Sequence, residues 1–200
     1  MKKWMIAFLS GLLICTGCSA SKTESGSSVS NALEKKTQEN SSSENEMNAA
    51  VVYFSATGNT QRIAEKMAVI LNADLYEIVP SETYTDEDLN YNNNSCRANL
   101  EMNDDNARPE ILGDLSEIEN YETIYLGYPI WWGTAPRIID TFLEKYDLSA
   151  KNVYVFCTSG SSGIENSISD LADKVNIVDG HRFDADATDT EIEEWLESLK

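Results

Sequence analysis

Residues 49–60, which read AAVVYFSATGNT, decide the fold. The first half of this stretch, residues 49–54, is a continuous apolar run, which is typical of a strand buried on both faces of a sheet. The second half is short and polar, and it leads into residues 59–72. There the apolar side chains of Ile63, Met67, Ile70 and Leu71 recur at helical spacing. The stretch therefore predicts a strand, a tight loop and a helix in direct succession.

The same alternation continues along the chain. We expect strands over residues 49–54, 75–79, 121–128, 152–157 and 176–183, and helices over residues 59–72, 136–146, 165–175 and 188–199. This order predicts a doubly wound α/β fold, a five-stranded parallel sheet with helices on both faces. In such sheets, ligands bind beyond the carboxyl ends of the strands, where the strand order reverses. The loops after Phe54, Tyr128 and Cys157 are therefore the candidate site.

The first of these loops is suited to a phosphate. Ser55, Thr57, Asn59 and Thr60 carry hydrogen-bonding side chains, and Gly58 permits tight backbone curvature. The helix that begins near Asn59 directs free N–H groups and the positive end of its dipole at the loop. The loop is neither a Walker loop nor a Gly-x-Gly-x-x-Gly turn. The alternative is that these polar side chains only cap the helix.

The second and third loops combine aromatic and small residues. Residues 127–136 read GYPIWWGTAP, and two tryptophans in a loop are unfavourable unless a partner covers them. We expect one of Trp131 and Trp132 to contact a flat ligand and the other to anchor the loop in the core. Residues 158–163 read TSGSSG, and their small side chains let the backbone approach the polar edge of a ligand.

The segment Tyr53–Thr60 resembles the FMN-phosphate loop of flavodoxins, whose pattern is Ser/Thr-x-Thr-Gly-x-Thr, and the resemblance extends over residues 49–199. It implies the flavodoxin strand order 2-1-3-4-5 and a non-covalently bound FMN. Flavodoxins often carry an aromatic residue in the third loop, and residues 158–163 contain none. The resemblance implies these cofactor-binding residues: Ser55, Ala56, Thr57, Gly58, Asn59, Thr60, Tyr128, Pro129, Ile130, Trp131, Trp132, Gly133, Thr158, Ser159, Gly160 and Gly163.

The N-terminal residues predict export. Lys2 and Lys3 precede an apolar run over residues 4–14, which is too short to span a membrane. Gly17 before Cys18 resembles the lipobox of bacterial lipoproteins, although Cys15 stands where that family usually has leucine. We therefore expect a signal peptide over residues 1–18, a lipid on Cys18 and an extracytoplasmic location with anchoring to the cell membrane. A simple secretory peptide is the alternative. Residues 19–47, rich in Ser, Asn, Glu and Lys, predict a disordered tether before a domain over residues 48–200.

Charge limits the choice of partners. The net charge is −19, and residues 48–200 contain 10 basic and 29 acidic residues, so this part carries the whole excess. Such a domain repels nucleic acid and favours a basic redox partner or a small electron acceptor. His181 is the single histidine, so the sequence predicts no metal site and no acid–base or nucleophilic catalytic residue. Cys96 and Cys157 are compatible with either a disulfide or two free thiols.

One long segment, residues 84–108, lies between the second and third predicted strands. We expect it to form a lid or short helices near the flavin, and a surface excursion is the alternative. The sequence as a whole favours an extracytoplasmic FMN-binding electron-transfer protein. An FMN-dependent NAD(P)H:quinone-type oxidoreductase is the second hypothesis, and a flavin-free scaffold or adhesion domain is the third. The sequence leaves open whether the chain is an enzyme in its own right.

Overall fold

A five-stranded parallel sheet organises the part of the chain that the computed structural model describes, residues 48–200. The predicted signal peptide, the predicted lipid on Cys18 and the predicted tether fall outside these residues. The strands are β1 (Ala49–Tyr53), β2 (Asp74–Glu77), β3 (Thr123–Pro129), β4 (Asn152–Thr158) and β5 (Ile177–Phe183). Their order is β2-β1-β3-β4-β5, with every neighbouring pair parallel, so the predicted fold class and strand order are confirmed.

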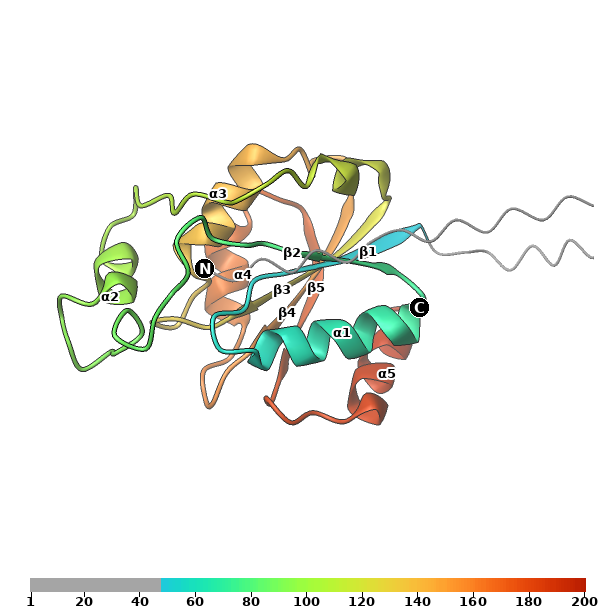
Figure 1. Cartoon of the computed structure of the whole chain (residues 1–200). Helices are drawn as coiled ribbons and strands as arrows, with labels where there is room; N and C mark the ends of the chain where they lie inside the picture. Colours follow the sequence, from blue (N-terminus) through green and yellow to red (C-terminus); the bar gives the residue numbers. More distant parts are fainter. Residues whose placement is uncertain (1–47) are drawn as a thin grey trace, which may run out of the picture. The chain divides into compact units, whose positions relative to one another are not determined.

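Helices cover both faces of this sheet (Figure 1). The helices are α1 (Asn59–Leu71), α2 (Arg97–Met102), α3 (Arg137–Lys145), α4 (Glu165–Leu171) and α5 (Asp189–Ser198), and a 3₁₀ helix, η1, spans Ser116–Asn120. Helices α1 and α5 pack with Val51 and Tyr53 of β1, whereas α3 and α4 pack on the face that carries Ala50 and Val52. All five residues of β1 are buried, as the continuous apolar run predicts.

The boundaries of some elements differ from the prediction. The second strand is β2 at Asp74–Glu77 rather than residues 75–79, and it is mostly exposed because it lies at the edge of the sheet. Helix α4 ends at Leu171 rather than at residue 175, since the chain then turns, with Lys174 N–H donating to the Leu171 carbonyl at 2.9 Å. The start of α5 is as expected, with a reciprocal capping box between Thr188 and Glu191.

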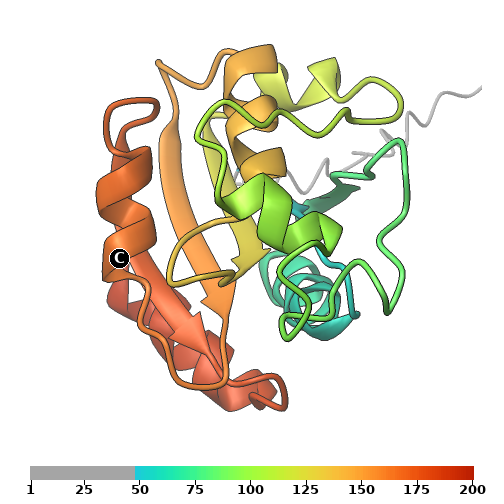
Figure 2. The same ribbon diagram turned by 90° about the vertical axis from the view of Figure 1, so that its left-hand side faces the viewer.

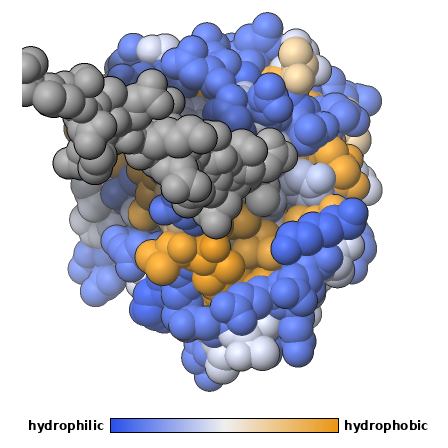
Figure 3. Space-filling model, turned by 90° about the vertical axis from the view of Figure 1, so that its right-hand side faces the viewer, coloured by the Kyte–Doolittle hydropathy of each residue, from blue (hydrophilic) through white to orange (hydrophobic). Residues whose placement is uncertain are grey.

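The two ends of the sheet differ in chemistry. Figure 2 looks onto the carboxyl ends of the strands, where α2 and the loops gather. Figure 3 shows the opposite end, where apolar surface lies between hydrophilic flanks. A hollow there of about 390 Å³ is lined mainly by the last turns of α1 and α5 and by Tyr125 and Tyr154 of the sheet. Within residues 48–200, no helix combines the length and apolar character needed to cross a membrane.

Gly127 in β3 leaves room for the ring of Phe156 on the neighbouring strand β4. A Cβ at this position would lie 2.2–2.8 Å from ring carbons of Phe156 on β4, which is itself fully buried. We expect Gly127→Ala to lower the free energy of unfolding by about 1–3 kcal/mol, the usual cost of overpacking a core. Urea denaturation measures this change. Gly160→Ala is the control because its Cβ meets nothing within 4 Å. Equal stability of the two variants would contradict the expectation.

Candidate functional site

The three predicted loops meet at one cavity of about 470 Å³ at the carboxyl end of the sheet. This volume lies within the range of about 300–1,000 Å³ that is usual for small-molecule sites. The three loops line the cavity with Ala56, Thr57, Asn59, Pro129, Ile130, Trp131, Thr158, Ser159 and Gly160. Two further segments also line it, Leu89 with Tyr91 and residues 184–186. The first of these segments belongs to the lid predicted from the sequence, whereas no sequence motif marks the second.

The first loop leaves the N-terminus of α1 without a side-chain cap. Gly58 is the N-cap residue with φ of 80°, a left-handed conformation that favours glycine. No side chain accepts a hydrogen bond from the first turn, and this turn contains no acidic residue. The alternative that the polar side chains only cap the helix is therefore wrong. The first-turn N–H groups, which have no partner within a helix, remain available to a ligand beside the cavity.

Two of the predicted cofactor-binding residues, Thr60 and Tyr128, are buried in the core and do not line the cavity. The fully buried Thr60 forms a 2.8 Å hydrogen bond through Oγ1 with Oγ1 of Thr158, which ties the first loop to the third. The fully buried Tyr128 has its hydroxyl 3.1 Å from Oγ of Ser167 on α4, and burial raises the pKa of this phenol. The sequence places Tyr128 among the cofactor-binding residues, whereas the structure buries it and leaves it outside the cavity lining.

The two tryptophans of the second loop have opposite environments. Trp131 is 4% exposed, lines the cavity and packs edge-on against Phe54 and Tyr84, with ring centroids 5.7 and 5.1 Å away. Trp132 is 58% exposed and lies outside the cavity lining, with its ring 6.3 Å from that of Tyr91. One indole therefore anchors the loop, as expected. The structure adds that this same indole, Trp131, also borders the cavity.

A tight turn produces this difference. The backbone groups of Trp131 and Thr134 exchange hydrogen bonds of 2.9 and 3.0 Å, so Trp132 and Gly133 form a two-residue turn. Both have positive φ, 53° and 84°, and this conformation is unfavourable for a bulky residue such as tryptophan. Thr134 Oγ1 donates to Asp170 on α4 at 2.6 Å and holds the turn in place. Gly133 lies outside the cavity lining.

The third loop is held in a defined conformation by its own residues and by β5. Oγ of Ser159 accepts from the Ser162 N–H at 2.8 Å, and the Ser159 carbonyl accepts from Arg182 at 2.9 Å. Arg182 also pairs with Asp184. Gly163 lies outside the cavity lining, and a Cβ there would clash with the Glu165 carboxylate. This loop lacks the aromatic residue that flavodoxins often carry there. An aromatic side chain, Tyr91 of residues 84–108, borders the cavity instead.

Residues 84–108 form short helical structure beside the cavity, as one of the two hypotheses expected (Figure 2). Tyr84 is buried, donates to Glu101 at 2.6 Å and lies under the Arg97 guanidinium, 4.1 Å from the ring centroid. Asn99 of α2 donates to the carbonyls of Tyr91 and Asn93. These contacts hold Tyr91 against the cavity.

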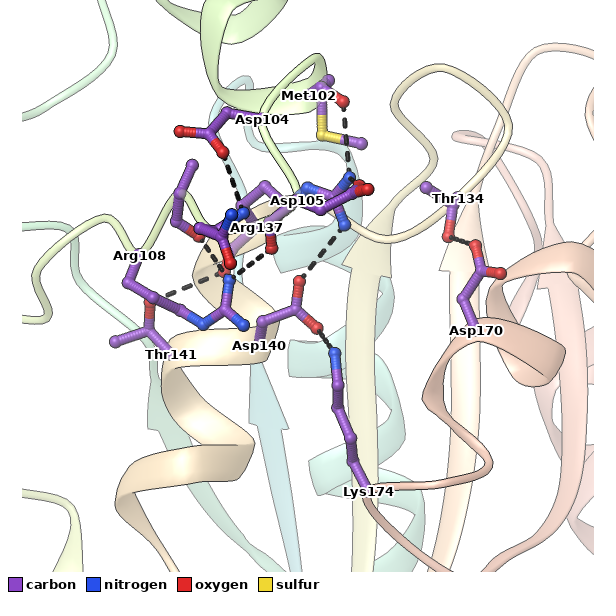
Figure 4. Close-up of polar contacts among 12 residues, drawn as sticks. Met102, Asp104, Asp105, Arg108, Thr134, Arg137, Asp140, Thr141, Asp170 and Lys174 are labelled. Carbon is purple, nitrogen blue, oxygen red and sulfur yellow. Dashed lines mark hydrogen bonds and ion pairs between the residues drawn. The ribbon is translucent and has the colours of Figure 1, made fainter.

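Charged groups connect this segment to α3 (Figure 4). Arg137 contacts Asp105 at 2.5 Å, the Met102 carbonyl at 3.4 Å and Asp140 at 3.5 Å. The Asp140 carboxylate is 6% exposed and also pairs with Lys174 from the chain after α4. The network therefore joins the end of α2 to both helices on that face of the sheet.

Cys96 and Cys157 are free and buried, so the alternative of a disulfide between them does not hold. Burial raises the pKa of the Cys157 thiol to about 12. Because the thiolate is the reactive form, we expect iodoacetamide at about pH 8 to leave Cys157 unmodified in the folded protein. Peptide mass mapping should find it alkylated only after denaturation. Alkylation of Cys157 in the folded protein would contradict this expectation.

A family model described as flavodoxin matches residues 48–199, about three quarters of the chain. The chain belongs to the flavodoxin family. Its cofactor is therefore non-covalently bound FMN. The cavity fits this group because it combines uncapped helix N–H groups for a phosphate with an aromatic wall at Trp131 and Tyr91 for a flat ring.

Solved structures of similar proteins agree with the family assignment. A candidate flavoprotein from Bacteroides eggerthii DSM 20697 is 42% identical, with a TM-score of 0.72, and the match covers 76% of this chain and 96% of that chain. A second, from Bacteroides uniformis ATCC 8492, is 39% identical, with a TM-score of 0.71 and coverage of 74% and 97%. A flavoprotein from Lactobacillus acidophilus NCFM, crystallised in complex with FMN, is 27% identical, with a TM-score of 0.57 and coverage of 74% and 97%.

A curated relative is also similar in sequence. It is an uncharacterized protein of Methanocaldococcus jannaschii, 30% identical over 115 residues, which are 57% of this chain. The match spans 55% of the length of that relative.

Proposed function

We propose that this flavodoxin is an electron-transfer protein that works outside the cytoplasm, tethered to the membrane by a lipid on Cys18. The observation that carries the redox assignment is the uncapped N-terminus of α1 beside a cavity with an aromatic wall. Bound FMN supplies the one- and two-electron chemistry of its ring system. The location rests on the sequence of residues 1–18.

Each loop contacts a different part of FMN in this proposal. The N–H groups of the first turn of α1 and the hydroxyls of Ser55 and Thr57 bind the phosphate. Trp131 and Tyr91 shelter the ring from water, and stacking of this kind contributes about 1–3 kcal/mol per ring. The backbone of Ser159 and Gly160 faces the polar edge of the ring. Thr60 and Thr158 keep the first and third loops together through their mutual hydrogen bond.

Carboxylates around the cavity select the redox partner. Asp184 and Asp186 line the cavity, and residues 82–108 contain seven carboxylates against two arginines. This charge attracts a partner with a basic face and repels phosphorylated nicotinamide cofactors. The surface therefore supports electron transfer between proteins over a stand-alone NAD(P)H-dependent reductase.

Absorbance and stopped-flow measurements on the purified full chain test the redox role. We expect a flavin spectrum, electron transfer to a basic c-type cytochrome that slows as salt is added, and no NAD(P)H consumption by the protein alone. Rapid NADH or NADPH oxidation with a quinone acceptor would instead favour the reductase. A colourless protein that leaves FMN fluorescence unchanged would favour the flavin-free scaffold.

Membrane fractionation tests the location in a bacterial host that processes lipoproteins. We expect the wild type in the membrane fraction and Cys18→Ala outside it. Cys15→Leu is the matched control, because it also removes a cysteine but gives this position the residue that the lipoprotein family usually has, so we expect it to stay in the membrane fraction. Wild-type protein that stays in the cytoplasm would refute the proposed location.

A further inference from the structure

Arg62 differs from the other arginines of residues 48–200 in its partners. Arg97, Arg108, Arg137 and Arg182 each form an ion pair with at least one carboxylate. Arg62 instead donates to uncharged groups, Asn59 Oδ1 at 2.6 Å and the Ala185 carbonyl at 3.5 Å. This part of the chain has 29 acidic residues and 10 basic ones, so carboxylates are abundant. A guanidinium without an anionic partner therefore stands out.

The position of this guanidinium points to an anion. Arg62 lies in the first turns of α1, and its backbone N–H donates to the carbonyl of Gly58 at 3.2 Å. A Cβ built on Gly58 would lie 4.0 Å from Arg62 Nη1, so the guanidinium lies beside the first loop. Its two hydrogen-bond partners, Asn59 and Ala185, both line the cavity. The cation thus lies where the first loop and residues 184–186 meet.

A bound phosphate and two aspartates would place several negative charges at this end of the cavity, and a nearby cation would reduce their repulsion. A phosphate monoester carries a charge of about −1.5 to −2 at neutral pH. Asp184 and Asp186 line the same cavity, and only Asp184 is paired, with Arg182. The exposed Asp186 would repel a phosphate. A guanidinium offsets that repulsion, because it binds phosphate with charge-assisted hydrogen bonds.

We propose that Arg62 is the counter-charge of the FMN phosphate and the residue by which this chain distinguishes FMN from riboflavin. The proposal rests on the proposed function, and it adds one charged residue to the N–H groups and hydroxyls that bind the phosphate. Arg62 holds the phosphate by charge, and α1 supplies directed N–H groups. Because riboflavin lacks the phosphate, it loses the contribution of Arg62 and keeps the contacts with the ring.

Fluorescence titration of the purified full chain with FMN and with riboflavin tests this role. We expect Arg62→Gln to raise the Kd for FMN about 10- to 100-fold, as for other hydrogen bonds to charged groups, and the Kd for riboflavin less than about 2-fold. Added salt should weaken FMN binding to the wild type and have little effect on the variant. Arg62→Lys should retain part of the preference, because it keeps the charge and loses the planar geometry.

Lys66→Gln is the matched control, since it removes the same charge one turn further along α1, where Lys66 pairs with Asp189 at 3.0 Å. We expect it to change the Kd for FMN less than about 2-fold. Riboflavin binding by Arg62→Gln shows that the cavity is still folded. Equal loss of both ligands in Arg62→Gln would mean that Arg62 only holds the loops together, and unchanged FMN affinity would also overturn the proposal. Wild-type protein that binds neither ligand would overturn the proposed function as well.

Discussion

Replacing Trp131 with alanine is expected to lower the free energy of unfolding by about 3–5 kcal/mol, the usual cost of truncating a buried aromatic residue. Trp131 is 4% exposed and packs edge-on against Phe54 and Tyr84. Its removal leaves a cavity where the second loop meets residues 84–108. Because the indole also borders the cofactor cavity, FMN should bind more weakly. Urea denaturation of the cofactor-free protein and FMN titration measure the two effects.

Trp132→Ala provides the control for this substitution. The chemical change is the same, but the Trp132 side chain is 58% exposed, so we expect the free energy of unfolding to fall by less than about 1 kcal/mol. The substitution removes the contact between the Trp132 and Tyr91 rings. Equal destabilisation by the two substitutions would show that the two indoles contribute equally to the core, against the structure.

Asp140→Ala is the second change with a large expected effect. Its carboxylate is 6% exposed and pairs with both Arg137 and Lys174, so its loss leaves two cations of the network without their shared partner. Removing one member of a buried ion pair costs about 3–5 kcal/mol. We expect the low end of that range, because both cations retain some contact with water. FMN affinity should also fall, since Arg137 holds the segment that carries Tyr91.

Asp105→Ala tests the same network from its exposed side. Asp105 also pairs with Arg137, but its side chain is 92% exposed. Exposed pairs contribute about 0–1 kcal/mol, so we expect a change in unfolding free energy within that range. Denaturation curves of both variants in urea separate the two cases. A loss of less than about 1 kcal/mol in Asp140→Ala would indicate that the buried network adds no stability.

Much of the fold follows from patterns that extend over a few residues. The apolar run before Ser55 indicates a strand buried on both faces, and the recurrence of Ile63 and Met67 indicates the helix after it. Likewise, Thr188 and Glu191 lie three residues apart, as a capping box requires. Such patterns could not predict that β2 lies at the edge of the sheet, because the exposure of a strand depends on its neighbours in the sheet. For the same reason its boundaries were predicted less accurately.

The candidate site was predictable to the level of loops. A parallel sheet brings the carboxyl ends of its strands to one edge, so the loops after β1, β3 and β4 had to meet. Residues 184–186 and Arg62 were missed because neither belongs to a recognisable motif. Arg62 became a candidate only when the ion pairs of the other arginines were known.

The sequence by itself determined the order of elements and the edge of the sheet at which the three candidate loops meet, since both follow from residues close together in the chain. The tertiary structure alone decided which tryptophan is buried, that Thr60 and Tyr128 point into the core, and that Tyr91 supplies an aromatic wall. Adjacent residues such as Trp131 and Trp132 have the same composition and pattern. Their environments diverge because the two-residue turn points one side chain at Phe54 and Tyr84, and leaves the other in solvent.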